Sequence, residues 1–404
     1  MRPRAWSALA LLGFGSGLPL LLTDSTLKAW LQLAGVDITV IGFFALVQLP
    51  YALKFLWAPF LDRYVPPFLG RRRGWLAVTQ ALLVALLIAM AFGDPHGHLR
   101  LLAGLALGLA FVSASQDTVT DAWRTEYLPK DRQAMGTAAH VSAYRLAMVV
   151  ASTLAGLLAA HWGWRAAYLL MAGFMVLGLL GVWLAEEPEL DHPPRTLAEA
   201  VVEPFRVFLK RRGAWAALAF LVLYKIGDQL ATSLTWPYFL SRGFSLSAVA
   251  LMSKGVGIPG LMVGGLLSGW WMAKWSLKRG LLVCGLFQIL STLSLLLPTY
   301  LGPKLPVLGL SIALENIGYG MGVTVFMTFM MRLCDRHYTA TQFALFTSLT
   351  ALSRSLLASP AGLVVKHEGW IFFFGGICAL SAIPGLVMLL WWDRWGVPEE
   401  AAAS

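Results

Sequence analysis

A group of ionisable residues lies in a stretch of the chain that is otherwise strongly apolar. Asp117, Asp121 and Arg124 are separated by four and three residues, so they share one face of a helix. Charged side chains are costly inside a membrane unless they are paired or border water. A carboxylate in such a poorly hydrated place favours its protonated form, and a nearby cation opposes this. The face therefore predicts a pathway for something polar and a group that can exchange a proton.

A structural interpretation of the same face stays open. Asp121 and Arg124 can pair with Asp62 and Arg63 and lock the molecule in a closed state. We assign Asp121 to proton coupling and Asp117, with its neighbour Gln116, to substrate binding. The residues assigned to gating are Asp62, Arg63, Arg71 and Arg124.

A second group of charges lies later in the chain. Lys225 and Asp228 are three residues apart and can pair within one helix, and Gln229, Thr232, Ser233 and Thr235 continue the polar stripe. A polar stripe of this length indicates that the helix lines a cavity. The alternative is that Lys225 and Asp228 form a static structural ion pair. Glu315 precedes Asn316 in the glycine-rich run ENIGYGMG and has no opposite charge three or four residues away. It needs a partner from another helix unless it lies wet at the outer interface. We assign Asp228 and Glu315 to proton coupling and Lys225 and Asn316 to substrate binding.

The composition places these residues in a membrane protein. The chain has 404 residues, of which 58% are hydrophobic and 13% charged, whereas soluble domains carry about 25% charged residues. Twelve apolar stretches can each cross a hydrocarbon core about 30 Å thick as helices. They lie at about 6–34, 38–60, 75–93, 99–122, 133–160, 164–185, 214–240, 246–272, 281–298, 305–332, 340–365 and 370–392. The predicted fold is an all-α membrane protein with twelve transmembrane helices in two six-helix bundles.

The net charge of +10 follows the predicted topology rather than a nucleic-acid surface. With an even number of spans, nineteen Lys and Arg lie on the side of the two termini and five lie opposite, so both termini are predicted to be cytoplasmic. The three cysteines lie within or at the ends of spans, which argues against disulfides or a metal site. We expect no metal and no cofactor.

The chain divides into two halves. Residues 1–185 and 214–404 are the predicted bundles, and 186–213 is a cytoplasmic linker in which Leu197, Val201 and Phe205 have helical spacing. An interfacial helix and a bare tether both remain open for it. The halves share features at an offset of 206–208 residues, such as Gly35 with Gly243 and Gly163 with Gly369. Two repeated six-span halves predict a transporter that rocks about a central site.

Several segments carry a family resemblance. LDRYVPPFLGRRRG (61–74) resembles the loop between the second and third spans of the major facilitator superfamily. The chain is also similar to the AmpG-type muropeptide permeases of Gram-negative bacteria, from about Leu11 to Trp392. The strings that carry this similarity are the same segment with its upstream residues, SASQDTVTDAWRTEYLP, LYKIGDQLA and ATQFAL (340–345). The resemblance implies proton-driven import of 1,6-anhydro-muropeptides across the inner membrane. These are N-acetylglucosaminyl-anhydro-N-acetylmuramic acid with or without its stem peptide, and they feed β-lactamase induction.

Such a substrate suggests roles for further residues. Arg145 has no acid within helical reach, so it can grip a substrate carboxylate or pair with Asp121. Tyr144 and Trp236 can stack on sugar rings. Asp24 and Lys28 share a face of the first span, where the resemblance implies uncharged polar residues instead. They either contact substrate or line a wet entrance.

Lys54 is expected to extend to the cytoplasmic surface rather than contact substrate.

The same fold is compatible with other transport functions. The alternatives are a carrier of another bulky anion such as acetyl-coenzyme A, and an exporter of drugs or metabolites. A membrane-embedded enzyme is not expected, because the seven His lie mostly in loops and no paired catalytic set lies in a span. The expected partners are a small-molecule substrate, protons and lipid, without nucleic acid, and the expected state is a monomer.

Overall fold

The computed structural model describes residues 3–394 except 190–193, 195 and 359–360. Every regular element in this described part is a helix. The helices form two compact units, which are described separately. The first unit comprises most of residues 1–204, without Lys130–Ala138, together with Cys334–Ser348. The second comprises Lys130–Ala138, Phe205–Leu333 and the chain from Leu349 onward.

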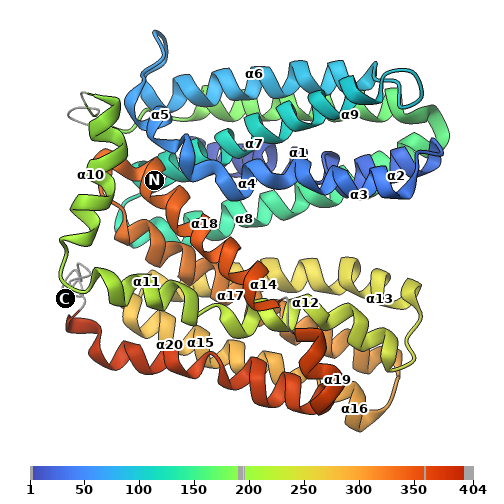
Figure 1. Cartoon of the computed structure of the whole chain (residues 1–404). Helices are drawn as coiled ribbons and strands as arrows, with labels where there is room; N and C mark the ends of the chain where they lie inside the picture. The colour runs from blue at the N-terminus through green and yellow to red at the C-terminus, as the bar shows by residue number, and fades with distance from the viewer. Residues whose placement is uncertain (1–2, 190–193, 195, 359–360, 395–404) are drawn as a thin grey trace. The chain divides into compact units, whose positions relative to one another are not determined.

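Four long helices form the body of the first unit and lie side by side (Figure 1). They are α1 (Pro3–Leu22), α6 (Arg71–Ala91), α7 (Leu99–Tyr127) and α9 (Ala155–Leu184). Shorter elements complete it: α2 (Ser25–Leu33), α3 (Ile38–Phe43), α4 (Leu49–Leu53), α5 (Ala58–Arg63), much of α8 (Gln133–Val149), the first half of α10 (Leu197–Leu209) and the start of α18 (Thr339–Ala358).

The second apolar stretch is not one continuous helix. Two 3₁₀ turns, Phe44–Gln48 and Lys54–Leu56, separate α3, α4 and α5. Pro50 and Pro59 lie in the first turns of α4 and α5, where proline is tolerated because those amides have no partner within the helix. These breaks change the direction in which the polar side chains of the segment project.

The second unit contains α11 (Ala214–Leu223), α12 (Ile226–Ser241), α13 (Leu246–Met252), α14 (Ile258–Met272), α15 (Leu277–Ser294), α16 (Leu297–Leu301), α17 (Leu305–Leu333), α19 (Ala361–Ile371) and α20 (Ile383–Met388). Helices α14 and α17 lie in close contact because glycines face the neighbouring backbone. A Cβ atom on Gly264 would collide with the carbonyl oxygen of Ile317, and one on Gly320 would collide with that of Leu261. Small residues at such an interface let helix backbones approach closely.

The sequence repeat has a structural counterpart in the two cores. In the first unit Trp30 stacks on Trp164 with ring centroids 5.7 Å apart and lies 5.2 Å from Tyr168. In the second unit Tyr238 lies 5.2 Å from Trp370 and 5.0 Å from Phe374. The second set follows the first at offsets of 208, 206 and 206 residues.

The glycines that correspond in the two halves also have similar backbone dihedral angles. Gly163 and Gly369 both have φ of 80°, and Gly35 and Gly243 have φ of 73° and 91°. These are left-handed values that glycine adopts without strain.

Ten helical segments of the described residues are long and apolar enough to cross a membrane. One of them, Lys130–Leu184, has 55 residues and contains the non-helical Gly163. Helix α18, of 20 residues, is not among the ten. The predicted all-helical membrane architecture is therefore confirmed, whereas the count of twelve spans stays a prediction.

Candidate functional site

The first polar group lies on α7 in the first unit. Ser113, Gln116 and Asp117 occupy one stripe of this helix, which continues to Thr120 beside Ser16 of α1, with their hydroxyl oxygens 3.5 Å apart. Gln116 is fully buried, and one carboxylate oxygen of Asp117 has no hydrogen-bond partner among the described residues. The structure therefore places the two predicted substrate residues Gln116 and Asp117 together.

Lys54 does not extend to a surface as expected. It is 7% exposed and is the cation that acts most strongly on Asp117. The expectation assumed a continuous helix, but the 3₁₀ turn that begins at Lys54 redirects its side chain. A buried ammonium group needs an anionic partner, and Asp117 supplies the charge.

Asp121 and Arg124 form an ion pair, with Oδ1 and Nη2 2.9 Å apart. Arg124 is fully buried, and its charge also acts on His140 of α8. The alternative pairing of these residues with Asp62 is not formed in this structure, where the polar side-chain and carbonyl contacts of Asp62 within the described part of the chain are with Arg71, Arg72, Ala340 and Thr341. The guanidinium of Arg63 lies 5.4 Å from the ring centre of Tyr64.

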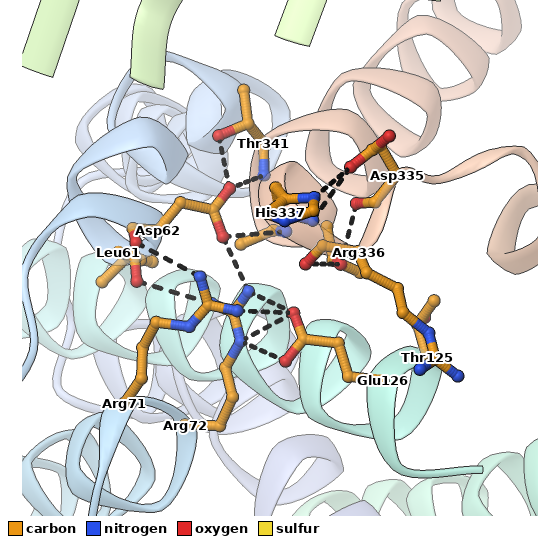
Figure 2. A network of polar contacts seen from close by, with 12 residues as sticks. Leu61, Asp62, Arg71, Arg72, Thr125, Glu126, Asp335, Arg336, His337 and Thr341 are labelled. Atoms are coloured by element: carbon orange, nitrogen blue, oxygen red, sulfur yellow. Dashed lines mark hydrogen bonds and ion pairs between the residues drawn. The ribbon is translucent and has the colours of Figure 1, made fainter. Parts of the chain in front are cut away.

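A buried arginine network joins three helices of the first unit (Figure 2). It consists of Asp62, Arg71, Arg72 and Glu126. Arg72 Nη2 lies 2.7 Å from Asp62 Oδ1 and 2.5 Å from Glu126 Oε1, and its Nε donates to Glu126 Oε2 at 3.0 Å. Arg71 Nη2 donates to Glu126 Oε1 at 3.0 Å. Bidentate guanidinium–carboxylate contacts of this kind are among the strongest polar contacts in proteins.

Asp62 also binds the N-terminus of α18. Its carboxylate accepts hydrogen bonds from the amide of Ala340 at 3.3 Å. It also accepts from the amide of Thr341 at 2.8 Å and from the Thr341 hydroxyl at 2.7 Å (Figure 2). The first amides of a helix have no partner within it, and the helix dipole favours an anion there. Asp62 thereby links α5, α6 and α18.

Three members of this arrangement were not predicted from the sequence. Arg72, Glu126 and Thr341 were not assigned, although Arg71 and Asp62 were. The available signal was an acid, Glu126, at the end of a polar span and three arginines at 71–73 that needed counter-charges.

The second unit holds an acid–lysine cluster formed by Lys225, Asp228 and Glu315. Lys225 Nζ lies 2.5 Å from Asp228 Oδ2, and both side chains are at most 7% exposed. Both charges act on Glu315 of α17, so the expected cross-helix partner is present. Asn316 donates to Glu315 Oε2 at 2.8 Å, and Lys225 lies 4.9 Å from the ring centre of Tyr319.

A helix break positions this cluster. Helix α11 ends at Leu223 and α12 begins at Ile226, so Lys225 lies in the interruption, at the N-cap position of α12. Gly227 allows the close approach of the backbone at Cys378, because a Cβ atom there would collide with its carbonyl oxygen. Broken helices at charged sites are a feature of membrane transporters.

The other assigned residues lie in different surroundings. Tyr144 lies near Asp117, Asp121 and Arg145 in the first unit. Arg145 donates to the sulfur of Met148 at 3.6 Å. Asp24 and Lys28 form an ion pair of 2.5 Å with about a third of each side chain exposed, at 34% and 33%. Trp236 is 43% exposed.

Comparisons with known proteins agree with one another. The model of the Major Facilitator Superfamily matches residues 5–358. An anhydromuropeptide permease of Escherichia coli (strain K12) is 43% identical over 392 residues, covering 96% of this chain and 79% of the relative. An uncharacterized protein of Haemophilus influenzae is 38% identical over 395 residues, covering 95% and 93%.

Two solved structures share the fold. The transporter FucP in the outward conformation has a TM-score of 0.68 at 14% identity, with 96% of this chain and 98% of that chain covered. The human organic anion transporter MFSD10 has a TM-score of 0.64 at 18% identity, with 96% and 100% covered. At these identities the likeness concerns the fold alone.

Proposed function

Because the chain belongs to the major facilitator superfamily and, within it, to the family of the anhydromuropeptide permeases, we propose that it imports 1,6-anhydro-muropeptides across the bacterial inner membrane together with protons. The chain is a multi-pass membrane transporter and not an enzyme. Its cargo would be the disaccharide N-acetylglucosaminyl-anhydro-N-acetylmuramic acid, with or without a stem peptide.

The proposed topology has twelve spans and two repeated bundles, 1–185 and 214–404. The 55-residue segment Lys130–Leu184 is long enough for two spans that meet at Gly163, and α18 supplies one more. The excess of Lys and Arg in the loops on the side of the termini supports a cytoplasmic location for both ends. Helix α10 exposes Leu197, Val201 and Val202, which suits a helix lying at the cytoplasmic membrane surface.

The acid–lysine cluster is the observation that carries proton coupling. Two carboxylates and one ammonium group lie together in an apolar helix bundle, so the cluster has a net charge of −1 when both acids are ionised. One added proton makes it neutral. Since isolated charge is costly in a membrane, the protonated and unprotonated clusters favour different surroundings. We assign the coupling proton to Asp228 and Glu315, with Asp121 as a further carrier in the first unit.

The polar group of the first unit is proposed to hold the substrate. Asp117 and Gln116 provide hydrogen bonds, and Tyr144 provides a ring face. Arg145 is assigned to the carboxylate of the lactyl group or stem peptide, because a guanidinium can bind a carboxylate with two parallel hydrogen bonds.

The arginine network is proposed to be the gate. Asp62 holds the start of α18 only while its carboxylate accepts from Ala340 and Thr341. Release of these hydrogen bonds frees the helix, and Arg71 and Arg72 keep the acids paired meanwhile.

Uptake of labelled disaccharide into proteoliposomes tests the proposal. We expect accumulation only with an inward proton gradient, and its loss when an uncoupler is added. Asp228→Asn and Glu315→Gln should each abolish accumulation and retain exchange of internal for external disaccharide, because exchange requires no net proton movement. Accumulation that withstands the uncoupler would refute coupling, and normal accumulation by both variants would place the proton site elsewhere.

A further inference from the structure

Several buried polar atoms on α4 and α7 lie close together without hydrogen-bond partners in the described part of the structure. They are the hydroxyl oxygens of Tyr51 and Ser113, Oδ1 of Asp117 and both amide atoms of Gln116. Buried polar atoms in proteins are almost always hydrogen-bonded, and each exception requires an explanation. Other buried tyrosines of this chain follow the rule: the hydroxyls of Tyr168 and Tyr224 donate to the carbonyls of Leu22 and Leu281, both at 2.9 Å.

These atoms belong to one place in the first unit. Ser113, Gln116 and Asp117 share a stripe of α7, and the Tyr51 hydroxyl faces the hydroxyls of Ser113 and Thr23 and the charge of Asp117 without forming a hydrogen bond of good geometry with any of them. Tyr51 is on α4, the short piece that the two 3₁₀ turns isolate. Tyr51 and Asp117 are half-buried residues, so the group reaches the edge of the packed core.

The charges of this group balance. Asp117 faces Lys54, and the next charges, Asp121 and Arg124, form their own ion pair. The charges of these four residues sum to zero, and Arg145, which lies beyond Tyr144, is assigned to the carboxylate of the other ring, so the group around Tyr51 does not itself select a charged ligand. Its unpartnered atoms include donors on Tyr51, Ser113 and Gln116 and acceptors on Asp117 and Gln116. A matching ligand must therefore be neutral and must both donate and accept several hydrogen bonds.

We infer that Tyr51, Ser113 and Asp117 form a subsite for the N-acetylglucosamine ring of the substrate, an inference that rests on the proposed function. Sugar hydroxyls donate and accept, and the acetamido group does the same. The anhydro-N-acetylmuramic acid ring is the poorer match because it carries the lactyl carboxylate or the stem peptide. Tyr51 and Ser113 are the residues that this assignment adds.

A structural water molecule would satisfy the same atoms. The two explanations differ in the effect of deleting a hydroxyl group. If the hydroxyl binds only substrate, its removal leaves the empty protein equally stable or more stable, because an unpartnered buried group is lost. If it binds a structural water, its removal destabilises the empty protein and leaves ligand affinity unchanged.

The test uses the purified full chain in lipid nanodiscs, with Tyr51→Phe and Ser113→Ala as variants and Tyr168→Phe as the control. Thermal unfolding without ligand and the Kd for the disaccharide are measured for each. We expect Tyr51→Phe and Ser113→Ala to raise the Kd about tenfold without lowering the unfolding temperature. Tyr168→Phe should lower the unfolding temperature and keep the Kd, since its hydroxyl bonds a carbonyl of the protein.

A second ligand identifies the ring. Anhydro-N-acetylmuramic acid alone lacks the N-acetylglucosamine ring, so the variants should bind it as well as the unaltered chain does. Equal weakening of both ligands, or an unchanged Kd for the disaccharide, would overturn the subsite while the transport function stands. If the unaltered chain binds neither ligand, the proposed function fails and the subsite fails with it.

Discussion

Replacement of Arg72 by glutamine is expected to destabilise the fold more than the same replacement of its neighbour Arg71. Arg72 is bound to two carboxylates, Asp62 and Glu126, and is 1% exposed. In the described part of the chain Arg71 binds one carboxylate, that of Glu126, through a hydrogen bond of 3.0 Å. It also donates to the main-chain carbonyl of Asp62 at 3.4 Å. The two positions therefore form a matched pair with the same residue type, the same helix and different numbers of acidic partners.

The expected losses in free energy of unfolding depend on which buried groups each substitution leaves without a partner. Arg72→Gln leaves two buried carboxylates, one of them without its arginine, and breaking a buried pair in this way costs about 3–5 kcal/mol. Arg71→Gln removes one charge-assisted hydrogen bond, about 1.5–3 kcal/mol, and Glu126 stays bound to Arg72. The difference of about 2 kcal/mol corresponds to a factor of about 30 in the folding equilibrium.

The assay is equilibrium unfolding in mixed micelles, followed by circular dichroism as the denaturing detergent is increased. Arg73→Gln serves as the control, because among the described residues the side chain of Arg73 donates to a backbone carbonyl, that of Val182 at 3.3 Å, and to no carboxylate. We expect losses in the order Arg72, Arg71, Arg73. Equal losses for Arg71 and Arg72 would refute the central position of Arg72 in the network.

Three further outcomes are expected. Thr341→Val removes the hydroxyl that donates to Asp62 at 2.7 Å but keeps the amide, so it should cost about 1 kcal/mol in the same unfolding assay. No loss would mean that Arg72 and the two amides hold Asp62 without the hydroxyl. Gly264→Ala places a methyl group against the carbonyl of Ile317 and should lower the free energy of unfolding by about 1–3 kcal/mol. The control Gly255→Ala meets no atom within 4 Å and should lower it far less. A reversed order would contradict the close approach of α14 and α17. Lys28→Gln breaks an ion pair that is one third exposed and should change the free energy of unfolding by less than about 1 kcal/mol; a larger loss would show that Asp24 depends on it.

Contacts within one helix were accessible from the sequence. The pairs Asp121–Arg124 and Lys225–Asp228 follow from three-residue spacing, because helix geometry alone brings such side chains together. The helical architecture followed in the same way, since a membrane leaves the backbone few alternatives.

Contacts between distant segments were not accessible. Asp62 and Thr341 are 279 positions apart, and the spacing of residues says nothing about such pairs. The prediction that Lys54 extends to the cytoplasmic surface was wrong for a local reason, because no pattern in the segment indicated that 3₁₀ turns divide it.

The link between Asp62 and α18 has a consequence for synthesis of the chain. The amides that bind this carboxylate belong to residues made 278 and 279 positions later. At about 5–20 residues per second, this gap corresponds to roughly 15–55 s of translation. During that interval Arg72 is, among the described residues, the one partner of the Asp62 carboxylate already synthesised. A chain that stops before residue 339 would therefore lack the hydrogen bonds that the amides of α18 donate to it.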